Sequence, residues 1–321
     1  MWNIDGDTMN AAKKEIKKIS KKGGGILQKR SKGEKILFTI AFCVLLLHSL
    51  TLIFPVLWML MSSFKGALEY MGDMGTIEIF YFPKAWRAGN YSNFFENYTE
   101  AFQVLNKGNT TFFGMILNSV WYTLIRTACG VFIPAATGYV MSKYRFPGWN
   151  IIFTVAIVSM IIPIVGNTAS KMEIVDKMQI VNKPIFVLVD SLGGFGGTFL
   201  VFYGFFKALS WSYAEAVMID GGGHYTIFFK IMLPQAAPIL LTYAITGSID
   251  FWNEYEPVIL FLNDYPTLAS GLFEYQDDAI RLSNYPIYFA GLLISIIPTL
   301  LIFGIFSDRI MTSVSIGGLK G

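Results

Sequence analysis

Long apolar segments separated by short polar ones dominate the pattern of this chain. A helix needs roughly 20 mostly apolar residues to cross about 30 Å of hydrocarbon, and six segments approach that length. Their approximate bounds are residues 36–61, 112–140, 149–168, 185–206, 238–262 and 287–306. The second, fourth and fifth segments contain charged residues, whereas the first, third and sixth contain none. The pattern therefore predicts an all-α integral membrane protein with six transmembrane helices.

The charges between these segments predict how the chain is oriented. Residues 1–35 contain ten Lys or Arg and four Asp or Glu, and short positive segments stay cytoplasmic. With six crossings, the cytoplasmic segments hold 16 basic and 7 acidic residues, against 8 and 11 on the opposite side. We therefore expect both termini in the cytoplasm, with a basic tail over 1–35 and a transmembrane domain over 36–321.

The composition agrees with a membrane location and limits the chemistry. Hydrophobic residues make up 54% of the chain and charged residues 15%, against about 25% charged residues in soluble domains. This excludes a disordered protein and disfavours a soluble enzyme. Cys43 and Cys129 both lie in predicted spans, so neither a disulfide framework nor a cysteine zinc site can form. The first span exceeds the h-region of a signal peptide, which favours a retained anchor.

The cytoplasmic connection over residues 207–237 is longer and more structured than the other inside connections. Ser212 followed by Glu215 forms a capping-box pattern, with Ser212 as the N-cap, and predicts a helix over residues 213–219. The three glycines at 221–223 end this helix, because glycine adopts positive φ easily and destabilises helix interiors.

A second apolar stretch, 228–232, follows the glycines and is expected to end at Pro234. The product is two short amphipathic helices joined by a bend. One interpretation is a helix lying in the lipid headgroups, but such helices are rich in Lys and Arg, and this stretch has only Lys230. Glu215 and Asp220 make the first helix acidic, which favours docking into a protein socket.

The spacing within this connection matches a known motif. Glu215-Ala216-Val217 is followed after three residues by Gly221, after nine more by Ile231, and then by Leu233-Pro234. This resembles the EAA loop of ABC-importer permeases, EAA-x3-G-x9-I-x-LP, with Val217 in place of the second alanine of the motif.

Four other segments are similar to sugar permeases. They are Asn118-Ser119, residues 138–149, residues 251–262 and the glycine-rich tail 313–321. From about residue 50 to residue 321, the chain resembles the MalG-like permease subunits of carbohydrate ABC importers. The resemblance implies a multi-pass protein of the bacterial cytoplasmic membrane that imports an oligosaccharide or related carbohydrate with a binding-protein-dependent system.

The resemblance also implies partners and contact residues. The partners are a second permease subunit, two ATP-binding subunits and an extracellular solute-binding protein, besides membrane lipid; no nucleic-acid partner is expected. The implied ATPase-coupling residues are Glu215, Ala216, Ile219, Asp220, Gly221, Leu233 and Pro234. In the C-terminal tail the implied ATPase contacts are Gly317, Gly318, Leu319 and Lys320.

Nucleotide chemistry is expected on the partners rather than on this chain. The sequence contains no G-x-x-x-x-G-K-[ST] motif to hold phosphates and Mg²⁺. We therefore expect a non-enzymatic subunit without a cofactor of its own, with ATP and Mg²⁺ on the ATP-binding subunits.

Charged residues within the predicted spans are candidates for a substrate pathway, because they usually face a cavity or a partner. The candidates are Asp190, Asp250, Trp252, Asn253 and Glu254. Packing between spans through polar contacts is the favoured alternative, and a proton relay has little support because His48 lies on a different span. An ABC permease for another solute, or an ion-coupled carrier, stays open as an alternative function.

The outer segment 62–111 is rich in aromatic residues. They include Tyr81, Phe82, Trp86, Tyr91, Phe94 and Phe95. An aromatic belt at the membrane surface and a docking surface for the binding protein explain them equally well.

Overall fold

The computed structural model describes residues 32–91, 95–162, 166–282 and 284–317. Within these residues the regular structure is helical, and no strand is present. The chain divides after Trp58 into two units, Met1–Trp58 and Met59–Gly321, each of which is described by itself. The basic tail predicted over residues 1–35 lies almost entirely outside the described residues.

The first unit contains most of helix α2 (Lys32–Ser62). Apolar residues occur on every side of this helix, as expected for a span that faces lipid. The segment that follows is called the outer segment, after the location that the sequence predicts for residues 62–111, and it contains four short helical elements. They are α3 (Ala67–Asp73), the 3₁₀ helix η1 (Ile77–Phe80), α4 (Lys84–Arg87) and α5 (Glu96–Val104).

The remaining helices of the second unit fall into three groups. The first group is α6 (Phe112–Lys143), α7 (Trp149–Ile161), α8 (Thr168–Lys177), α9 (Ile185–Asp190) and α10 (Gly197–Ala208). The second is α11 (Ser212–Ile219), α12 (His224–Thr226), the π-helical turn η2 (Ile227–Met232) and α13 (Leu233–Gln235). The third is α14 (Ala237–Trp252), α15 (Glu256–Phe261), α16 (Leu268–Leu282) and α17 (Tyr285–Gly317).

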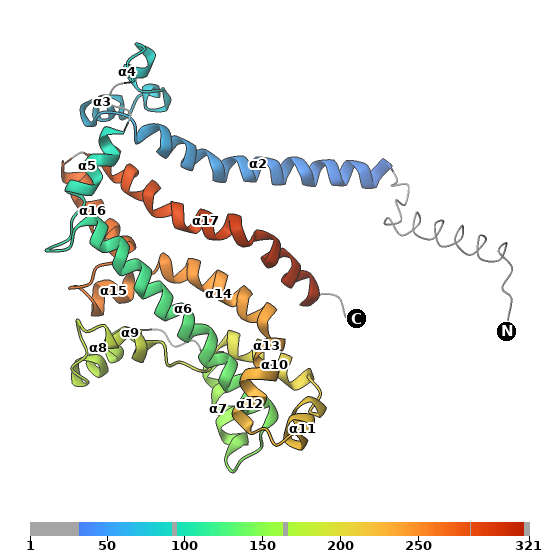
Figure 1. Cartoon of the computed structure of the whole chain (residues 1–321). Coiled ribbons are helices and arrows are strands. Elements are labelled where there is room, and N and C mark those ends of the chain that lie inside the picture. Colours follow the sequence, from blue (N-terminus) through green and yellow to red (C-terminus); the bar gives the residue numbers. More distant parts are fainter. Residues whose placement is uncertain (1–31, 92–94, 163–165, 283, 318–321) are drawn as a thin grey trace. The chain divides into compact units, whose positions relative to one another are not determined.

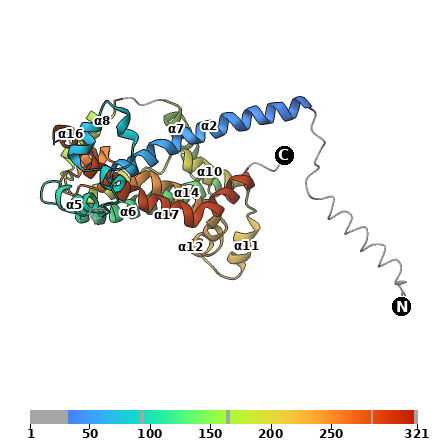
Figure 2. The ribbon, with the colours of Figure 1, turned by 90° about the horizontal axis from the view of Figure 1, so that it is seen from above.

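Helix α6 is the axis of the second unit. Helices α10 and α14 pack against it, and α17 packs against α14 and α5. The α6–α10 contact is close, because a Cβ on Gly138 would lie 2.9 Å from the backbone nitrogen of Tyr203. Figure 1 and Figure 2 place α11 and α12 at the end of this unit opposite α5 and α16.

Three buried clusters follow one another along α6. The Phe112 cluster joins its first turns to α5, α16 and α17, and includes Leu105, Met115, Leu272 and Ile287. The Tyr122 cluster joins its middle to α8, α9 and α15, and includes Val175, Phe186 and Phe261. The Tyr139 cluster joins its last turns to α10 and η2, and includes Phe202, Phe206, Ile227 and Met232.

Among the described residues, three unbroken helices are long and apolar enough to cross a membrane. They are α2, α6 and the Tyr285–Ser307 part of α17. The apolar helix α7, within the third predicted span, has 13 residues, or about 20 Å at 1.5 Å per residue.

Two segments expected as single helices are each divided in two, which corrects the sequence-based prediction. Residues 185–206 contain α9 and α10, separated by a stretch that includes Gly193 and Gly194. Residues 238–262 contain most of α14 and then α15, because α14 ends at Trp252 with Asn253 as its C-cap. Glycines lower helix stability in the first segment, and Pro257 begins a new helix in the second.

Candidate functional site

Residues 207–237, called here the 207–237 loop, form a compact group of short helices rather than an irregular surface loop. Ala214, Ile227, Phe228 and Met232 are buried on its underside, where they join the Tyr139 cluster. A fully buried Ile or Phe side chain contributes about 1.5–3 kcal/mol. The loop is therefore anchored to α6 and α10 through its apolar underside.

The opposite side of the loop is exposed and carries most of the sequence-predicted coupling residues. Glu215, Ala216, Ile219, Asp220, Gly221 and Pro234 are exposed, and Leu233 is half-buried. The Ile219 side chain is 85% exposed, and Tyr225, which the sequence did not single out, is 84% exposed. An exposed apolar side chain on a loop that is itself firmly packed is suited to contact another protein.

The bend between the two helical parts depends on two different properties of glycine. Gly221 has φ +77°, a conformation that glycine adopts without strain. A Cβ on Gly222 would lie 2.4 Å from Cγ1 of Val217, so a side chain cannot be accommodated there. The sequence pattern named Gly221 specifically, whereas the requirement at Gly222 comes from its contact with Val217 across the bend.

The start of α11 differs from the capping-box prediction. The helix begins at Ser212 with Trp211 as the N-cap, and the N-cap makes no side-chain hydrogen bond. The backbone N–H of Ser212 donates to Oγ of Ser210 at 3.3 Å, and Glu215 remains exposed. The predicted role of Ser212 as N-cap is therefore wrong, because Ser210 supplies the acceptor. Glu215 is free of any capping role in this arrangement.

The predicted end of the second helix at Pro234 is also wrong. The helical backbone continues through η2 and α13 to Gln235, with Pro234 in the first turn of α13. Proline is tolerated there because its missing N–H needs no helical partner in that turn. The direction changes at Ala236, where the axis from His224–Gln235 to α14 bends by 72°.

A short polar chain joins the 207–237 loop to the connection after α6. The hydroxyls of Tyr139 and Tyr144 lie 3.1 Å apart, and the Tyr144 hydroxyl lies 3.0 Å from Nδ1 of His224. Lys143 Nζ also donates to the carbonyl oxygen of Leu209 at 2.6 Å. These contacts fix the position of the loop relative to the end of α6. The sequence pattern did not predict them.

Two of the five candidate pathway residues meet at one arginine. Arg126 of α6 donates to Oδ2 of Asp190 at 2.8 Å through Nη1, and to Oε1 of Glu254 at 3.0 Å through Nη2. The hydroxyl of Tyr122 donates to the other oxygen of Glu254 at 2.7 Å, and Lys171 pairs with Asp190. Arg126 is the charged residue of the second predicted span, and it compensates both acids.

The other three pathway candidates do not join this network. Asp250 and Asn253 are exposed, and the Asn253 amide donates to the carbonyl oxygen of Ile249. Trp252 is buried in the Phe112 cluster and donates to the carbonyl oxygen of Ser295 at 3.0 Å. Asp250 and Glu254 are four residues apart in the sequence but do not share a helix face, because α14 ends at Trp252.

The predicted tail contacts lie at the edge of the described structure. Gly317 is the last residue of α17. Gly318, Leu319 and Lys320 lie outside the described residues.

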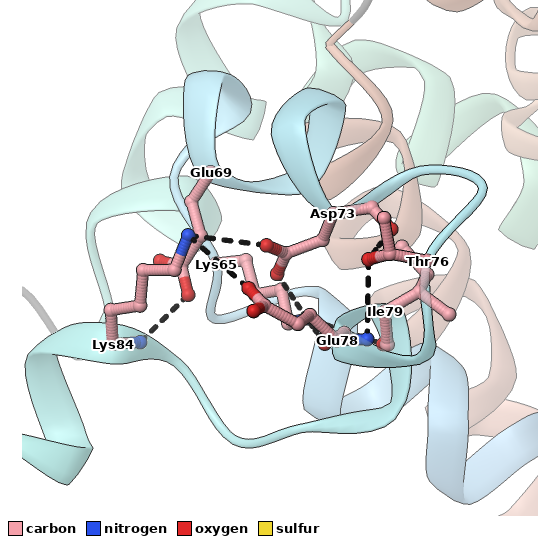
Figure 3. A network of polar contacts seen from close by, with 7 residues as sticks. All are labelled: Lys65, Glu69, Asp73, Thr76, Glu78, Ile79 and Lys84. Carbon is pink, nitrogen blue, oxygen red and sulfur yellow. Dashed lines mark hydrogen bonds and ion pairs between the residues drawn. The ribbon is translucent and has the colours of Figure 1, made fainter.

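The outer segment contains a buried ion network, shown in Figure 3. Lys65 and Asp73 have 0% and 1% of their side chains exposed, and Lys65 Nζ lies 2.8 Å from Oδ2 of Asp73. Lys65 also donates to the carbonyl oxygens of Glu78 and Ile79, which uses all three of its N–H donors. The hydrogen bond from Lys65 holds the pKa of Asp73 below its usual value.

Several aromatic residues of this segment lie around Trp86. The ring of Phe64 lies 4.9 Å from that of Trp86, and the rings of Phe82 and Tyr91 each lie 6.3 Å from it. Of the aromatic residues expected to form a belt or a docking surface, Tyr81, Phe82, Tyr91 and Phe95 are exposed. Phe94 lies outside the described residues.

Comparison with known proteins places the chain among sugar transporters. No protein-family model matches the sequence. It is 30% identical to the diacetylchitobiose uptake system permease protein NgcG of Streptomyces coelicolor over 284 residues, 88% of each chain. It is 29% identical to the arabinooligosaccharides transport system permease protein AraQ of Halalkalibacterium halodurans over 287 residues, 89% of this chain and 96% of the relative.

The fold is also similar to that of a solved transporter. One chain of a bacterial ABC transporter involved in the import of the acidic polysaccharide alginate superposes with a TM-score of 0.66 and 18% identity. The match covers 87% of this chain and 98% of the other. The chain therefore belongs to the family of carbohydrate ABC transporter permeases, subunits of sugar-import systems in the bacterial cell membrane.

Proposed function

We propose that this chain crosses the membrane six times, with both termini in the cytoplasm, as one of two permease subunits in an ATP-driven oligosaccharide importer. The excess of basic residues on the proposed cytoplasmic side supports the orientation. In this topology the α9–α10 and α14–α15 segments are broken crossings. Irregular backbone is tolerated at membrane depth where protein surrounds it, and the Tyr122 cluster packs around α9 and α15.

The 207–237 loop is the proposed docking element for an ATP-binding subunit. The observation that carries this proposal is its two-sided construction: the underside is buried in the Tyr139 cluster, whereas Glu215 and Ile219 are exposed. Glu215 would pair with a basic group of the socket, and Ile219 would enter its apolar part. Asp220 provides a second contact, and Gly221 gives the loop the bend that the socket requires.

The packing of the loop supplies a mechanical route from the ATP-binding subunit to the membrane. The chain passes from the loop into α14 through the 72° bend at Ala236, while the underside contacts α6 and α10. A displacement of the docked loop would therefore move three membrane helices together, because close-packed contacts transmit strain. We propose that this movement exchanges inward-open and outward-open states.

The remaining parts of the system lie on other chains. ATP and Mg²⁺ belong to two ATP-binding subunits, and an extracellular solute-binding protein delivers the sugar. A second, distinct permease subunit completes the pathway. In this arrangement Leu233 and Pro234 border the docking surface, and the Gly317–Lys320 tail would reach toward the ATP-binding subunits.

The polar residues within the spans have separate proposed roles. Arg126 compensates Asp190 and Glu254, which supports packing of the spans rather than a freely titrating proton relay. Asp250 and Asn253 are exposed and remain candidates for the substrate pathway or for the contact with the second permease. The contact of Trp252 with Ser295 supports a packing role for this residue.

Purification of the tagged chain in lipid nanodiscs tests the proposed function. We expect an ATP-binding subunit and a second permease to co-purify, and the ATPase rate to rise when a cognate solute-binding protein is added with its carbohydrate. Uptake that survives ATP depletion but collapses with an uncoupler would instead establish an ion-coupled carrier. ATPase stimulation by a non-carbohydrate solute alone would contradict the sugar assignment.

A further inference from the structure

The outer segment encloses a pocket that neither the 207–237 loop nor the Arg126 network explains. Its volume is about 240 Å³, and its lining includes Phe64, Gly66, Glu69, Trp86, Glu96 and Asn97. Drug-sized ligands occupy pockets of about 300–1,000 Å³, so this pocket suits a smaller group. At about 30 Å³ per water molecule, it has room for about eight waters.

The lining combines aromatic rings with planar polar groups. Phe64 and Trp86 have ring centroids 4.9 Å apart. Glu69 and Glu96 add two carboxylates, and Asn97 adds an amide. Carboxylate and amide oxygens accept hydrogen bonds from hydroxyl groups, while aromatic rings pack against the apolar C–H face of a sugar.

The polar groups also limit the charge of the ligand. Lys65 is the lysine that lines the pocket, and its ammonium group is fully engaged by Asp73 and two carbonyl oxygens. The two carboxylates therefore set the local charge of the lining. An anionic ligand is disfavoured by this charge, whereas hydroxyl and amide N–H donors are favoured.

The pocket walls are held in place by the ion network of Figure 3. The Asn97 amide donates to the carbonyl oxygens of Ser63 and Lys65 at 2.7 and 2.8 Å, which ties α5 to the turn between α2 and α3. The Lys84 backbone N–H donates to Oε1 of Glu69 at 2.7 Å, which ties α4 to α3. Binding to walls that are already ordered avoids part of the entropic cost of association.

We propose that this pocket is a carbohydrate subsite, which holds one neutral or N-acetylated pyranose ring of an oligosaccharide at the outer end of the chain. The proposal rests on the function proposed above, and it adds a direct contact between this subunit and the sugar. The Glu69 and Glu96 carboxylates accept from sugar hydroxyls, and the ring packs along the Phe64–Trp86 wall. The volume admits a single ring, so the rest of the oligosaccharide extends out of the mouth.

A pocket-filling variant with a matched control provides the test. Gly66 has φ −71°, and no atom lies within 4 Å of a Cβ built on it, so Gly66→Phe fills the pocket without straining the backbone. Gly72 in the neighbouring helix α3 also has nothing within 4 Å of an added Cβ and does not line the pocket. Gly72→Phe is therefore the control for an added ring in the same segment.

The measurement is saturation-transfer NMR on the assembled transporter in nanodiscs, without the solute-binding protein. The probes are diacetylchitobiose, which is N-acetylated, and maltotriose, which is neutral; both are built from pyranose rings. We expect a signal with the unaltered protein and with Gly72→Phe, and its loss with Gly66→Phe. Glu96→Ala, which leaves the pocket open, should weaken binding about tenfold, because it removes a charged acceptor.

Two results would overturn the inference. One is the absence of a signal from either sugar, and the other is an equal signal from Gly66→Phe and the unaltered protein. If Gly66→Phe keeps the sugar signal but binds the solute-binding protein more weakly, the pocket is instead a protein contact. Carbohydrate-stimulated ATPase activity would survive each of these results, so the inference and the proposed function fail separately.

Discussion

The guanidinium of Arg126 donates through Nη2 to Oε1 of Glu254 at 3.0 Å and joins α6 to the chain that follows α14. Its other terminal nitrogen, Nη1, lies 2.8 Å from Oδ2 of Asp190, at the end of α9. The Arg126 side chain is only 12% exposed. One side chain therefore ties together three segments whose charges, taken separately, are unfavourable in a membrane.

Replacement of Arg126 by Met should destabilise the protein strongly. Removal of one member of a buried ion network leaves an uncompensated charge, at a cost of about 3–5 kcal/mol. Thermal unfolding of the purified complex measures this loss. Lys177→Met is the control, because the exposed Lys177–Glu173 pair is worth about 0.3–0.5 kcal/mol. An Arg126→Met protein as stable as the control would contradict the structural role of the network.

Replacement of Asp73 by Asn should change how the outer segment responds to acid. The hydrogen bond from Lys65 lowers the pKa of Asp73, so this carboxylate stabilises the fold above its unfolded pKa of about 3.9. The stabilisation is lost as pH falls through the still lower folded pKa. The protection of peptides covering residues 65–84 against hydrogen exchange, taken relative to the intrinsic rate at each pH, should therefore fall below about pH 4.

In the Asp73→Asn protein, the same peptides should be less protected at neutral pH and lose little further protection on acidification, because Lys65 then lacks its charged partner. Lys84→Met is the comparison, since the Lys84 side chain is more than half exposed. An acid response in Asp73→Asn equal to that of the unaltered protein would assign the effect to other carboxylates.

The three consecutive glycines of the 207–237 loop should tolerate substitution unequally. Gly221→Val is strained by φ +77°, and Gly222→Val collides with Val217. Gly223 has φ −89° and nothing within 4 Å of an added Cβ, so Gly223→Ala serves as a neutral control. We expect the first two variants to insert into the membrane but to lower sugar uptake and stimulated ATPase activity together.

Uptake in proteoliposomes and ATPase rate, measured on the same preparations, check this expectation. Normal sugar uptake by both Gly221→Val and Gly222→Val would show that coupling does not depend on the bend.

A charge at Ile219 should uncouple the subunit without unfolding it. Its side chain is 85% exposed, so Ile219→Asp removes no internal contact of consequence but places a carboxylate against the proposed socket. We expect at least tenfold lower uptake, equivalent to about 1.4 kcal/mol or more, and weaker retention of the ATP-binding subunit during purification.

Leu68→Asp is the matched control for Ile219→Asp, because Leu68 is 86% exposed and lies in the outer segment. Glu215→Ala should act in the same direction as Ile219→Asp. Full retention of the ATP-binding subunit by both loop variants would show that the docking site lies elsewhere.

The sequence predicted the long helices well where hydrophobicity alone decides them. The run starting at Phe112 and the bend at Gly221 both appear in the structure. The sequence-based prediction failed where two nearby serines could each cap the helix. Ser210 rather than Ser212 accepts the hydrogen bond at the start of α11. Both serines satisfy the same local rule, so the local pattern alone does not choose between them.

The candidate site was partly visible in the sequence. Motif spacing nominated Glu215 and Gly221, and the family resemblance implied Ile219. All three are exposed in the structure, and their role in coupling stays a prediction. The partners of Asp190 and Glu254 were not visible, because Arg126 lies 64 and 128 residues away from them. Trp252 was expected near a pathway and is instead buried against α17, since a side chain's direction depends on which neighbours the helix meets.

By itself, the sequence determined that the chain is a membrane protein, how its ends are expected to lie, and which polar loop stands apart from the apolar helices. These properties follow from transfer free energies and local backbone preferences, which neighbouring residues along the chain are enough to set. Only the tertiary structure decided that Arg126 compensates two distant acids, that Gly222 must lack a side chain, and that the outer segment encloses a pocket. Those features depend on distances between particular side chains in the folded protein, which no sequence pattern contains.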